Sequence, residues 1–173
     1  MAGAPAGGQF DRDVVVIGGC GHVGLPLAIA FADRGASVGI YDVSTAAVET
    51  VNSGQLPFDE PGAAGVLERV VSEGRLRAST DASIVGSAEN VVVVIGTPVD
   101  EHLNPNPEAI PKALGGCSEY FRDGQLLILR STVFPGVTAL VEKMIAKLGV
   151  AMDVAFCPER IAEGMAMTEL FEL

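Results

Sequence analysis

The sequence predicts an α/β fold, a doubly wound parallel sheet of about six strands in a single domain. Short apolar runs alternate about six times with longer stretches of helical character, which is typical of parallel strands joined by helical crossovers. The run at 91–95 is continuous and β-branched, as expected for a strand that is covered on both faces. A glycine-rich turn follows the first apolar run, where doubly wound folds pass from strand into helix.

The apolar runs define the expected strands. Each run is short and is followed by a turn that contains polar residues, glycine or proline. Because the carboxyl ends of parallel strands meet at one edge of the sheet, we expect the residues after these runs to converge on one rim. In chain order the expected strands lie at 14–17, at 37–41, within 74–79, and at 91–95, 125–129 and 152–156.

The segments between the strands are expected to be helical. The first is apolar nearly all round, as in a helix buried in a layered fold, and Gly35 gives it a C-cap signal. Ser44 is expected to cap the second helix. The loop at 53–62 is longer than the usual connection, which makes it a candidate for function. In chain order the expected helices lie at 23–33, 45–52, 63–73, 81–88 and 108–121, with a last one that follows Gly136 and ends at 148.

The glycine turn has the spacing G-x-G-x-x-G of a dinucleotide-binding, Rossmann-like unit. Its first glycine allows the tight turn, the second lets backbone approach a pyrophosphate, and the third lets the helix pack close to the strand. Asp42 ends the second strand, 23 residues after Gly19, and can bind the ribose hydroxyls, which favours NAD over NADP. The alternative is a structural glycine turn with Asp42 as a helix N-cap. The candidate cofactor-binding residues of the turn are Gly19, Cys20, Gly21, His22, Val23 and Gly24.

Further polar residues follow the later strands and are expected on the same rim. These residues are Thr97, Ser131, Thr132, Glu159 and Arg160. Two simpler interpretations remain open. Ser131 and Thr132 could serve only to cap a strand end, and Glu159 and Arg160 could form a surface ion pair that contributes little stability.

Composition argues against several classes of protein. With 49% hydrophobic and 19% charged residues, the 173-residue chain is globular rather than disordered. The net charge of −11 argues against a nucleic-acid partner, and no apolar run is long enough for a membrane span. Residues 1–11 are expected to form a flexible tail and not a signal peptide. The three cysteines (Cys20, Cys117 and Cys157) match no metal-binding spacing, so we expect no metal, no disulfide and a cytoplasmic location.

Five segments together resemble the N-terminal domain of the UDP-glucose/GDP-mannose dehydrogenase family, whose members are nucleotide-sugar 6-dehydrogenases. Each segment alone is weak evidence for the family, but the order and spacing of the five are specific. Together they span nearly the whole chain beyond the tail. The segments are 19–28, 52–62 with its N-S-G and E-P-G ends, G-T-P-V at 96–99, S-T-V-F-P-G at 131–136, and P-E-R-I-A-E-G at 158–164.

The resemblance implies a reaction and a cofactor. The family oxidises the 6-hydroxymethyl group of a nucleotide sugar to a carboxylate, using two NAD and two hydride transfers. By motif position, residues 20–24 and Asp42 would hold the adenosine diphosphate half of NAD. Thr97, Ser131 and Thr132 would line the rest of the cofactor site.

The resemblance also implies three catalytic residues. Thr132 and Glu163 resemble the family pair that positions a water near the reacting carbon. Glu159 resembles the carboxylate associated with acid–base work in thioester hydrolysis, and a carboxylate suits proton transfer only where its surroundings raise its pKa. The three residues Pro158 to Arg160 resemble the form found in dehydrogenases of N-acetylated hexosamine nucleotides, such as the UDP-N-acetylmannosamine branch.

The chain departs from the family pattern in two respects. Ala47 stands where the family often has a basic residue that contacts the adenosine half of NAD. The family's catalytic cysteine lies in a C-terminal domain, beyond a long central helix through which members usually dimerise. We therefore expect residues 12–173 to be the NAD-binding domain of a longer, homodimeric enzyme, whose central helix and nucleotide-sugar domain lie outside this chain.

Two other functions remain open at this point. A β-hydroxyacid dehydrogenase would share a similar glycine loop, although the E-P-G loop and the segment at 158–164 argue against it. A non-catalytic NAD-binding module is the other possibility.

Overall fold

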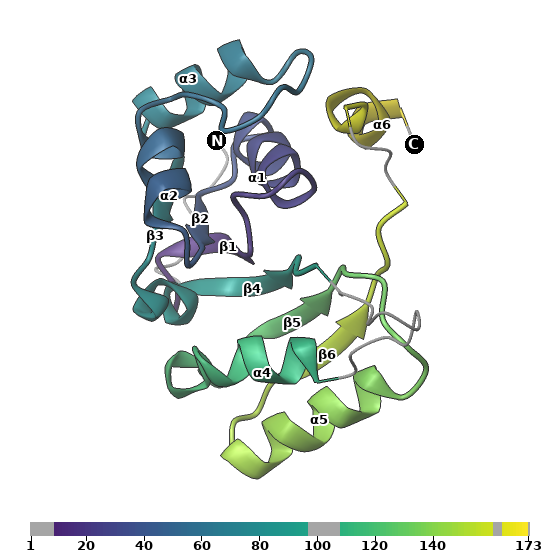
Figure 1. Cartoon of the computed structure of the whole chain (residues 1–173). Coiled ribbons are helices and arrows are strands. Elements are labelled where there is room, and N and C mark those ends of the chain that lie inside the picture. Colours follow the sequence, from purple (N-terminus) through teal and green to yellow (C-terminus); the bar gives the residue numbers. More distant parts are fainter. Residues whose placement is uncertain (1–8, 97–107, 161–163, 173) are drawn as a thin grey trace, which may run out of the picture.

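The computed structural model describes residues 9–96, 108–160 and 164–172. Its centre is a six-stranded sheet with parallel neighbours throughout, in the order β3-β2-β1-β4-β5-β6 (Figure 1). From β1 the chain builds outward to β3, then crosses back and builds outward from β4 to β6, so the doubly wound sheet expected from the sequence is confirmed. The strands are β1 (Arg12–Ile17), β2 (Val38–Tyr41), β3 (Leu76–Ser79), β4 (Ala88–Val93), β5 (Leu126–Leu129) and β6 (Asp153–Phe156).

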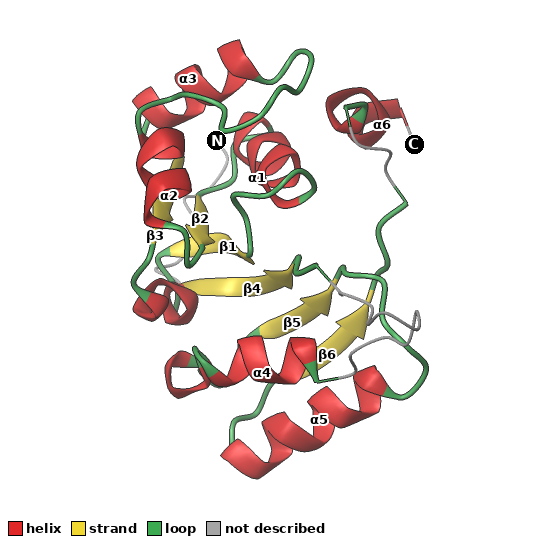
Figure 2. Ribbon diagram, viewed as in Figure 1, coloured by secondary structure: helices red, strands yellow, loops and turns green. Residues whose placement is uncertain are grey.

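Helices cover both faces of the sheet (Figure 2). Helices α1, α2, α3 and α6 lie on one face, and α4 and α5 lie on the other. In the described part of the chain, no helix is long and apolar enough to cross a membrane. The helices are α1 (Gly24–Asp33), α2 (Thr45–Asn52), α3 (Ala64–Ser72), α4 (Ala109–Gly115), α5 (Val137–Leu148) and α6 (Ala166–Glu172), with two 3₁₀ helices, η1 (Ala82–Ser87) and η2 (Ser118–Tyr120).

Strand β1 divides the apolar interior into two cores. Val14 and Val16 belong to the core under α1, α2 and α3, whereas Val15 and Ile17 belong to the core under α4 and α5. All four side chains are buried, because successive side chains of a strand point to opposite faces and both faces are covered. This explains why the central strands are continuous apolar runs rather than alternating ones.

Two expected helices differ from the structure. The helix expected at 108–121 is wrong in extent, because α4 ends at Gly115 and the short η2 follows. Gly115 and Gly116 are adjacent, and glycine is a poor helix former, so the helix ends there. The helix expected at 81–88 is the 3₁₀ helix η1, which the Asp81 side chain caps at its amino end.

The other differences lie at the strand ends. Strand β4 stops at Val93, two residues before its expected end. The backbone N–H of Ile95 donates to Ser131 Oγ at 2.8 Å, so a side chain takes the place of a ladder partner. Helix α6 was not expected, since its seven residues are too few to show a helical period. Residues 1–8 of the expected tail lie outside the described residues.

Candidate functional site

Two adjacent glycines make the turn after β1 possible. Gly18 has a φ of +74°, and a Cβ there would lie 2.2 Å from the carbonyl oxygen of Val94. A Cβ at Gly19 would lie 2.9 Å from the carbonyl oxygen of Val16. The motif spacing assigned the tight turn to Gly19, but the left-handed residue is Gly18. The Gly18-Gly19 pair was the signal that could have indicated this.

The other two glycines of the motif have opposite surroundings. A Cβ at Gly24 would lie 2.7 Å from the carbonyl oxygen of Gly18, so the first turn of α1 packs directly against the loop. A Cβ at Gly21 would meet nothing closer than 3.7 Å. Val23 is the N-cap of α1 and gives it no side-chain cap. Leu25 N–H donates to the Gly21 carbonyl oxygen at 2.9 Å and Pro26 has no N–H, so the N–H groups that remain for an anion are those of the loop and of Gly24. Open backbone beside an uncapped helix end fits the diphosphate of a dinucleotide.

Asp42 lies directly after β2, beside the glycine turn. Its Oδ2 accepts the backbone N–H of Cys20 at 3.0 Å, and its Oδ1 accepts the backbone N–H of Ser44 at 3.0 Å. The N-cap of α2 is Ser44, as expected, because its hydroxyl accepts the N–H of Ala47 at 3.3 Å. Asp42 therefore does not cap the helix itself. It fixes the turn to β2, and each carboxylate oxygen keeps a lone pair for a further donor.

A groove of about 550 Å³ runs along the strand ends and brings together most of the expected site residues. It is lined by eight of them: Gly21, His22, Val23, Gly24, Asp42, Ser131, Thr132 and Glu159. Gly19 and Cys20 are buried beneath the turn rather than in the groove wall. Thr97 and Glu163 lie outside the described residues. The groove is also lined by residues that no motif indicated as part of the site, namely Gly18, Val94, Ile95, Gly96 and Arg130.

A second hollow of about 410 Å³ adjoins the groove and shares Asp42 with it. Its walls are mainly apolar. They include Tyr41 at the end of β2, the largely exposed Val43 just after it, and Ala113 on α4. The ammonium-bearing side chain of Lys112 also lines it. A mainly apolar hollow next to a carboxylate suits an adenine base whose ribose reaches the carboxylate.

Ser131 and Thr132 have different environments although they are adjacent. Ser131 is buried, and its Oγ accepts the N–H of Ile95 at 2.8 Å and lies 3.5 Å from the carbonyl oxygen of Val93. The strand-end cap that was left open as an alternative therefore describes the hydroxyl of Ser131. Thr132 is exposed in the groove wall, so its hydroxyl is accessible to a bound molecule.

Glu159 is held by Arg130, at the end of the neighbouring strand. Arg130 Nη2 lies 2.6 Å from Glu159 Oε2, and the two side chains are only 20% and 11% exposed. The backbone N–H of Glu159 donates to the carbonyl oxygen of Arg130 at 2.9 Å, and Glu159 Oε1 accepts the N–H of Arg160 at 2.6 Å. The alternative of a surface pair between Glu159 and Arg160 gives way to a partly buried pair with Arg130. The sequence feature that could have indicated Arg130 is its position, as a cationic residue directly before Ser131 and Thr132.

None of the three cysteines is placed as a nucleophile facing this groove. Burial, with a smaller contribution from the Asp42 charge, raises the pKa of the Cys20 thiol to about 12. Burial raises the pKa of the Cys117 thiol to about 11. Cys157 is exposed, and Arg130 Nη1 donates to its sulfur at 3.4 Å, but it does not line the groove. Within the described residues, no group of three or more His, Cys, Asp or Glu side chains could hold a metal.

The imidazole of His22 contacts the long loop that was singled out in the sequence. The ring centroids of His22 and Phe58 are 4.0 Å apart, with 31° between the ring planes. The loop at 53–62 therefore touches the glycine turn directly, a contact that no motif spacing indicates.

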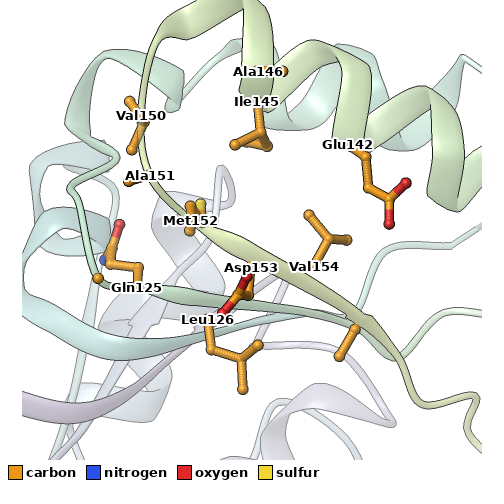
Figure 3. Close-up of a pocket in the computed structure, with 12 residues that line it drawn as sticks. Gln125, Leu126, Glu142, Ile145, Ala146, Val150, Ala151, Met152, Asp153 and Val154 are labelled. Atoms are coloured by element: carbon orange, nitrogen blue, oxygen red, sulfur yellow. The ribbon is translucent and has the colours of Figure 1, made fainter.

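A separate hollow of about 840 Å³ lies between α5 and β6, at an edge of the sheet (Figure 3). Glu142 and Ile145 of α5 and Asp153 and Val154 of β6 border it. It contains none of the expected site residues and borders the amino ends of β5 and β6, whereas ligands of doubly wound sheets bind at the carboxyl ends of strands. We therefore regard the groove at the strand ends as the functional site.

Comparison with known proteins agrees with this geometry. The model of the NAD-binding domain of the UDP-glucose/GDP-mannose dehydrogenase family matches residues 12–173. The UDP-N-acetyl-D-mannosamine dehydrogenases of Escherichia coli K12 and Campylobacter jejuni are each 32% identical to this chain, over 89% and 95% of its length. The chain spans only 39% and 42% of these two relatives.

Solved structures give the same result. A UDP-glucose dehydrogenase from Pyrobaculum islandicum matches with a TM-score of 0.85 and 30% identity, over 98% of this chain and 40% of that one. A UDP-D-ManNAc dehydrogenase from Pyrococcus horikoshii matches with a TM-score of 0.84 and 29% identity, over 91% of this chain and 38% of that one. The chain therefore belongs to the UDP-glucose/GDP-mannose dehydrogenase family, of which it is the NAD-binding domain.

Proposed function

We propose that this chain binds NAD in the strand-end groove, as part of an NAD-dependent nucleotide-sugar 6-dehydrogenase. The observation that carries the proposal is the open glycine cradle directly beside Asp42. The whole protein would oxidise the C6 alcohol of a nucleotide sugar to a carboxylate with two NAD, in the cytoplasm. In this proposal residues 1–11 form a tail, residues 12–173 form the cofactor domain, and a homodimeric central helix and a nucleotide-sugar domain complete the enzyme.

Each part of the groove has a distinct task in this proposal. The backbone of Gly21 to Gly24 and the amino end of α1 bind the diphosphate, and Asp42 binds the adenosine ribose. The apolar hollow beside Asp42 takes the adenine, and Thr132 lines the far half of the cofactor site. Bound NAD supplies the hydride acceptor. A 2′-phosphate would bring negative charge against the Asp42 carboxylate, so NADP is disfavoured.

The proposed catalytic residues belong to the far end of the groove. The exposed hydroxyl of Thr132, with the carboxylate of Glu163, would position a water near the reacting carbon. Glu159 would move protons during hydrolysis of a thioester intermediate. Its Oε2 is occupied by Arg130, so this role requires either Oε1 or a shift of the arginine. The thiol of that intermediate would come from sequence outside this chain.

We further propose a UDP-N-acetylhexosamine as substrate, in preference to UDP-glucose. Arg160, which follows the motif glutamate, is exposed next to the groove and offers a planar set of donors to a ligand. The curated relatives named above, both UDP-N-acetyl-D-mannosamine dehydrogenases, support this choice. An assay of NADH formation by the full-length protein against a panel of nucleotide sugars tests it. Faster turnover of UDP-glucose at equal concentration would rule the preference out.

The cofactor assignment is tested by calorimetry on this chain with NAD and NADP. We expect measurable binding of NAD, much weaker binding of NADP, and a weaker NAD affinity in Asp42→Ala by roughly 1.5–3 kcal/mol, the value of a hydrogen bond to a charged group. Asp13→Ala is the matched control, because Asp13 Oδ2 also accepts a backbone N–H, from Ser37 at 2.7 Å, near the opposite end of β1. Equal affinity for the two cofactors would contradict the assignment.

A further inference from the structure

Glu60 is a buried carboxylate that the proposed chemistry does not use. It lies in the long loop before α3 and is only 2% exposed. Its Oε1 accepts the backbone N–H of Met167 at 3.4 Å, and its Oε2 has no hydrogen-bond partner. A carboxylate is costly to bury without partners, so its place in the interior calls for a reason beyond packing.

The partner of Glu60 belongs to the first turn of α6. The first N–H groups of a helix lack partners within the helix, and a carboxylate there satisfies one of them. Helix α6 also packs on α1, and Met167 and Leu170 lie against the apolar core of that face. Glu60 therefore fastens α6 to the layer that carries the glycine turn.

Helix α6 is the next described element after Glu159. The chain leaves β6 at one end of the sheet's rim and continues to α6 beside α1 (Figure 1). At the β6 end, Glu159 is fixed to Arg130 by an ion pair and a backbone hydrogen bond. At the α6 end, Met167 is fixed to Glu60. Carboxylates therefore hold described residues on both sides of positions 161–163, Glu159 through its own side chain and Met167 through that of Glu60.

The same loop also contacts the cofactor side of the groove. Phe58, two residues before Glu60, places its ring 4.0 Å from that of His22 in the glycine turn. The backbone carbonyl of Glu60 accepts the N–H of Ala63 at 3.2 Å, which joins the loop to the start of α3. One short segment therefore touches the turn that would bind the diphosphate and the helix that follows the motif carboxylate.

We propose that Glu60 is a positioning residue, which anchors α6 and thereby fixes Glu159 relative to the cofactor groove. The roles of Glu159 in proton transfer and of the glycine turn in cofactor binding rest on the proposed function. The anchor itself is the contact between an acceptor oxygen of residue 60 and the N–H of Met167. It does not depend on whether a cofactor is bound.

Two variants separate the acceptor oxygen from the bulk of the side chain. Glu60→Met keeps the length and removes both acceptors, and it also removes a buried charge, so we expect it to fold. Glu60→Gln keeps one acceptor oxygen. Asp59→Asn is the matched control, because Asp59 is the exposed neighbouring carboxylate.

Amide hydrogen exchange of the NAD-free chain measures whether the contact between residue 60 and Met167 stabilises α6. We expect Glu60→Met to speed exchange in α6 about tenfold while leaving β1 and β4 unchanged, as for a locally loosened element. Glu60→Gln and Asp59→Asn should keep the wild-type rate. Wild-type protection of α6 in Glu60→Met, or equal loosening in Glu60→Gln, would overturn the proposal.

Steady-state kinetics of the full-length protein test whether Glu60 positions Glu159. We expect Glu60→Met to lower kcat for NADH formation about tenfold with little change in KM for NAD, and Glu60→Gln to restore kcat. An unchanged kcat in Glu60→Met would refute positioning. A chain that fails to bind NAD but shows the α6 effect would refute the proposed function and leave the anchor intact.

Discussion

Replacement by alanine should have opposite effects on stability at two glycines of the cofactor turn, lowering it at Gly24 but not at Gly21. A Cβ at Gly24 would lie 2.7 Å from both the Gly18 carbonyl oxygen and the Gly19 Cα, about 0.7 Å short of the 3.4 Å at which ordinary contact begins. Both neighbours are backbone, so α1 or the loop must move. Crowding of this kind costs about 1–3 kcal/mol. For a domain of this size it should lower Tm by about 2–12 °C.

Gly21→Ala should leave stability unchanged or slightly raised. The nearest atom to its Cβ would be the Gly18 carbonyl oxygen at 3.7 Å, and the φ of Gly21 is not positive, so alanine fits without strain. Such replacements stabilise a protein by about 0.4–1 kcal/mol through the unfolded state. The added methyl group would, however, occupy the groove. Loss of one hydrogen bond to a diphosphate should weaken NAD binding by about tenfold or more.

Thermal unfolding and NAD calorimetry on both variants measure the two effects. Gly65→Ala in α3 is the control, because its Cβ would meet nothing within 4 Å; we expect no loss of stability and no change in NAD affinity there. A Gly21→Ala variant that lowers Tm as much as Gly24→Ala and binds NAD as tightly as the wild type would contradict both expectations.

Three further predictions follow from the site. A maleimide at pH 8 should modify Cys157 alone. Raising the pH from 7 to 9 should not make Cys20 or Cys117 reactive, because their raised pKa values of about 12 and 11 keep both thiols protonated. Mass spectrometry that finds either one modified in the folded chain would contradict this. Ser131→Ala should lower the free energy of unfolding by about 1 kcal/mol, because the partly buried N–H of Ile95 loses its acceptor, whereas Thr132→Ala should not, and denaturant unfolding of the two variants decides. The chain alone should bind NAD yet form no NADH from any nucleotide sugar, and sustained turnover in a spectrophotometric assay would show that one of its own thiols is catalytic.

The sequence was sufficient for the sheet and for much of the groove. Buried parallel strands are apolar throughout, so β1 and β4 were readable as runs, and the residues after them necessarily shared one edge. Asp42 and the turn could be paired because motif spacing encodes their proximity. Whether Asp42 or Ser44 capped α2 could not be decided from spacing, because both are capping residues and only the hydrogen bonds distinguish them.

The remaining features depend on contacts between distant segments. Arg130 and Glu159 end different strands, and only the pairing of β5 with β6 brings the two together. Glu60 was part of a recognisable loop, but its hydrogen bond is with Met167 in α6, a helix too short to predict. Gly18 was overlooked because the motif counts from Gly19, whereas backbone strain falls one residue earlier.

NMR chemical-shift mapping of this chain with NAD tests most directly whether NAD binds at the carboxyl ends of the strands. We expect saturable shifts of the backbone amides from Cys20 to Gly24 and of Asp42 and Thr132, with the hollow between α5 and β6 unaffected. Saturable shifts confined to Glu142, Val154 and their neighbours in that hollow would contradict it.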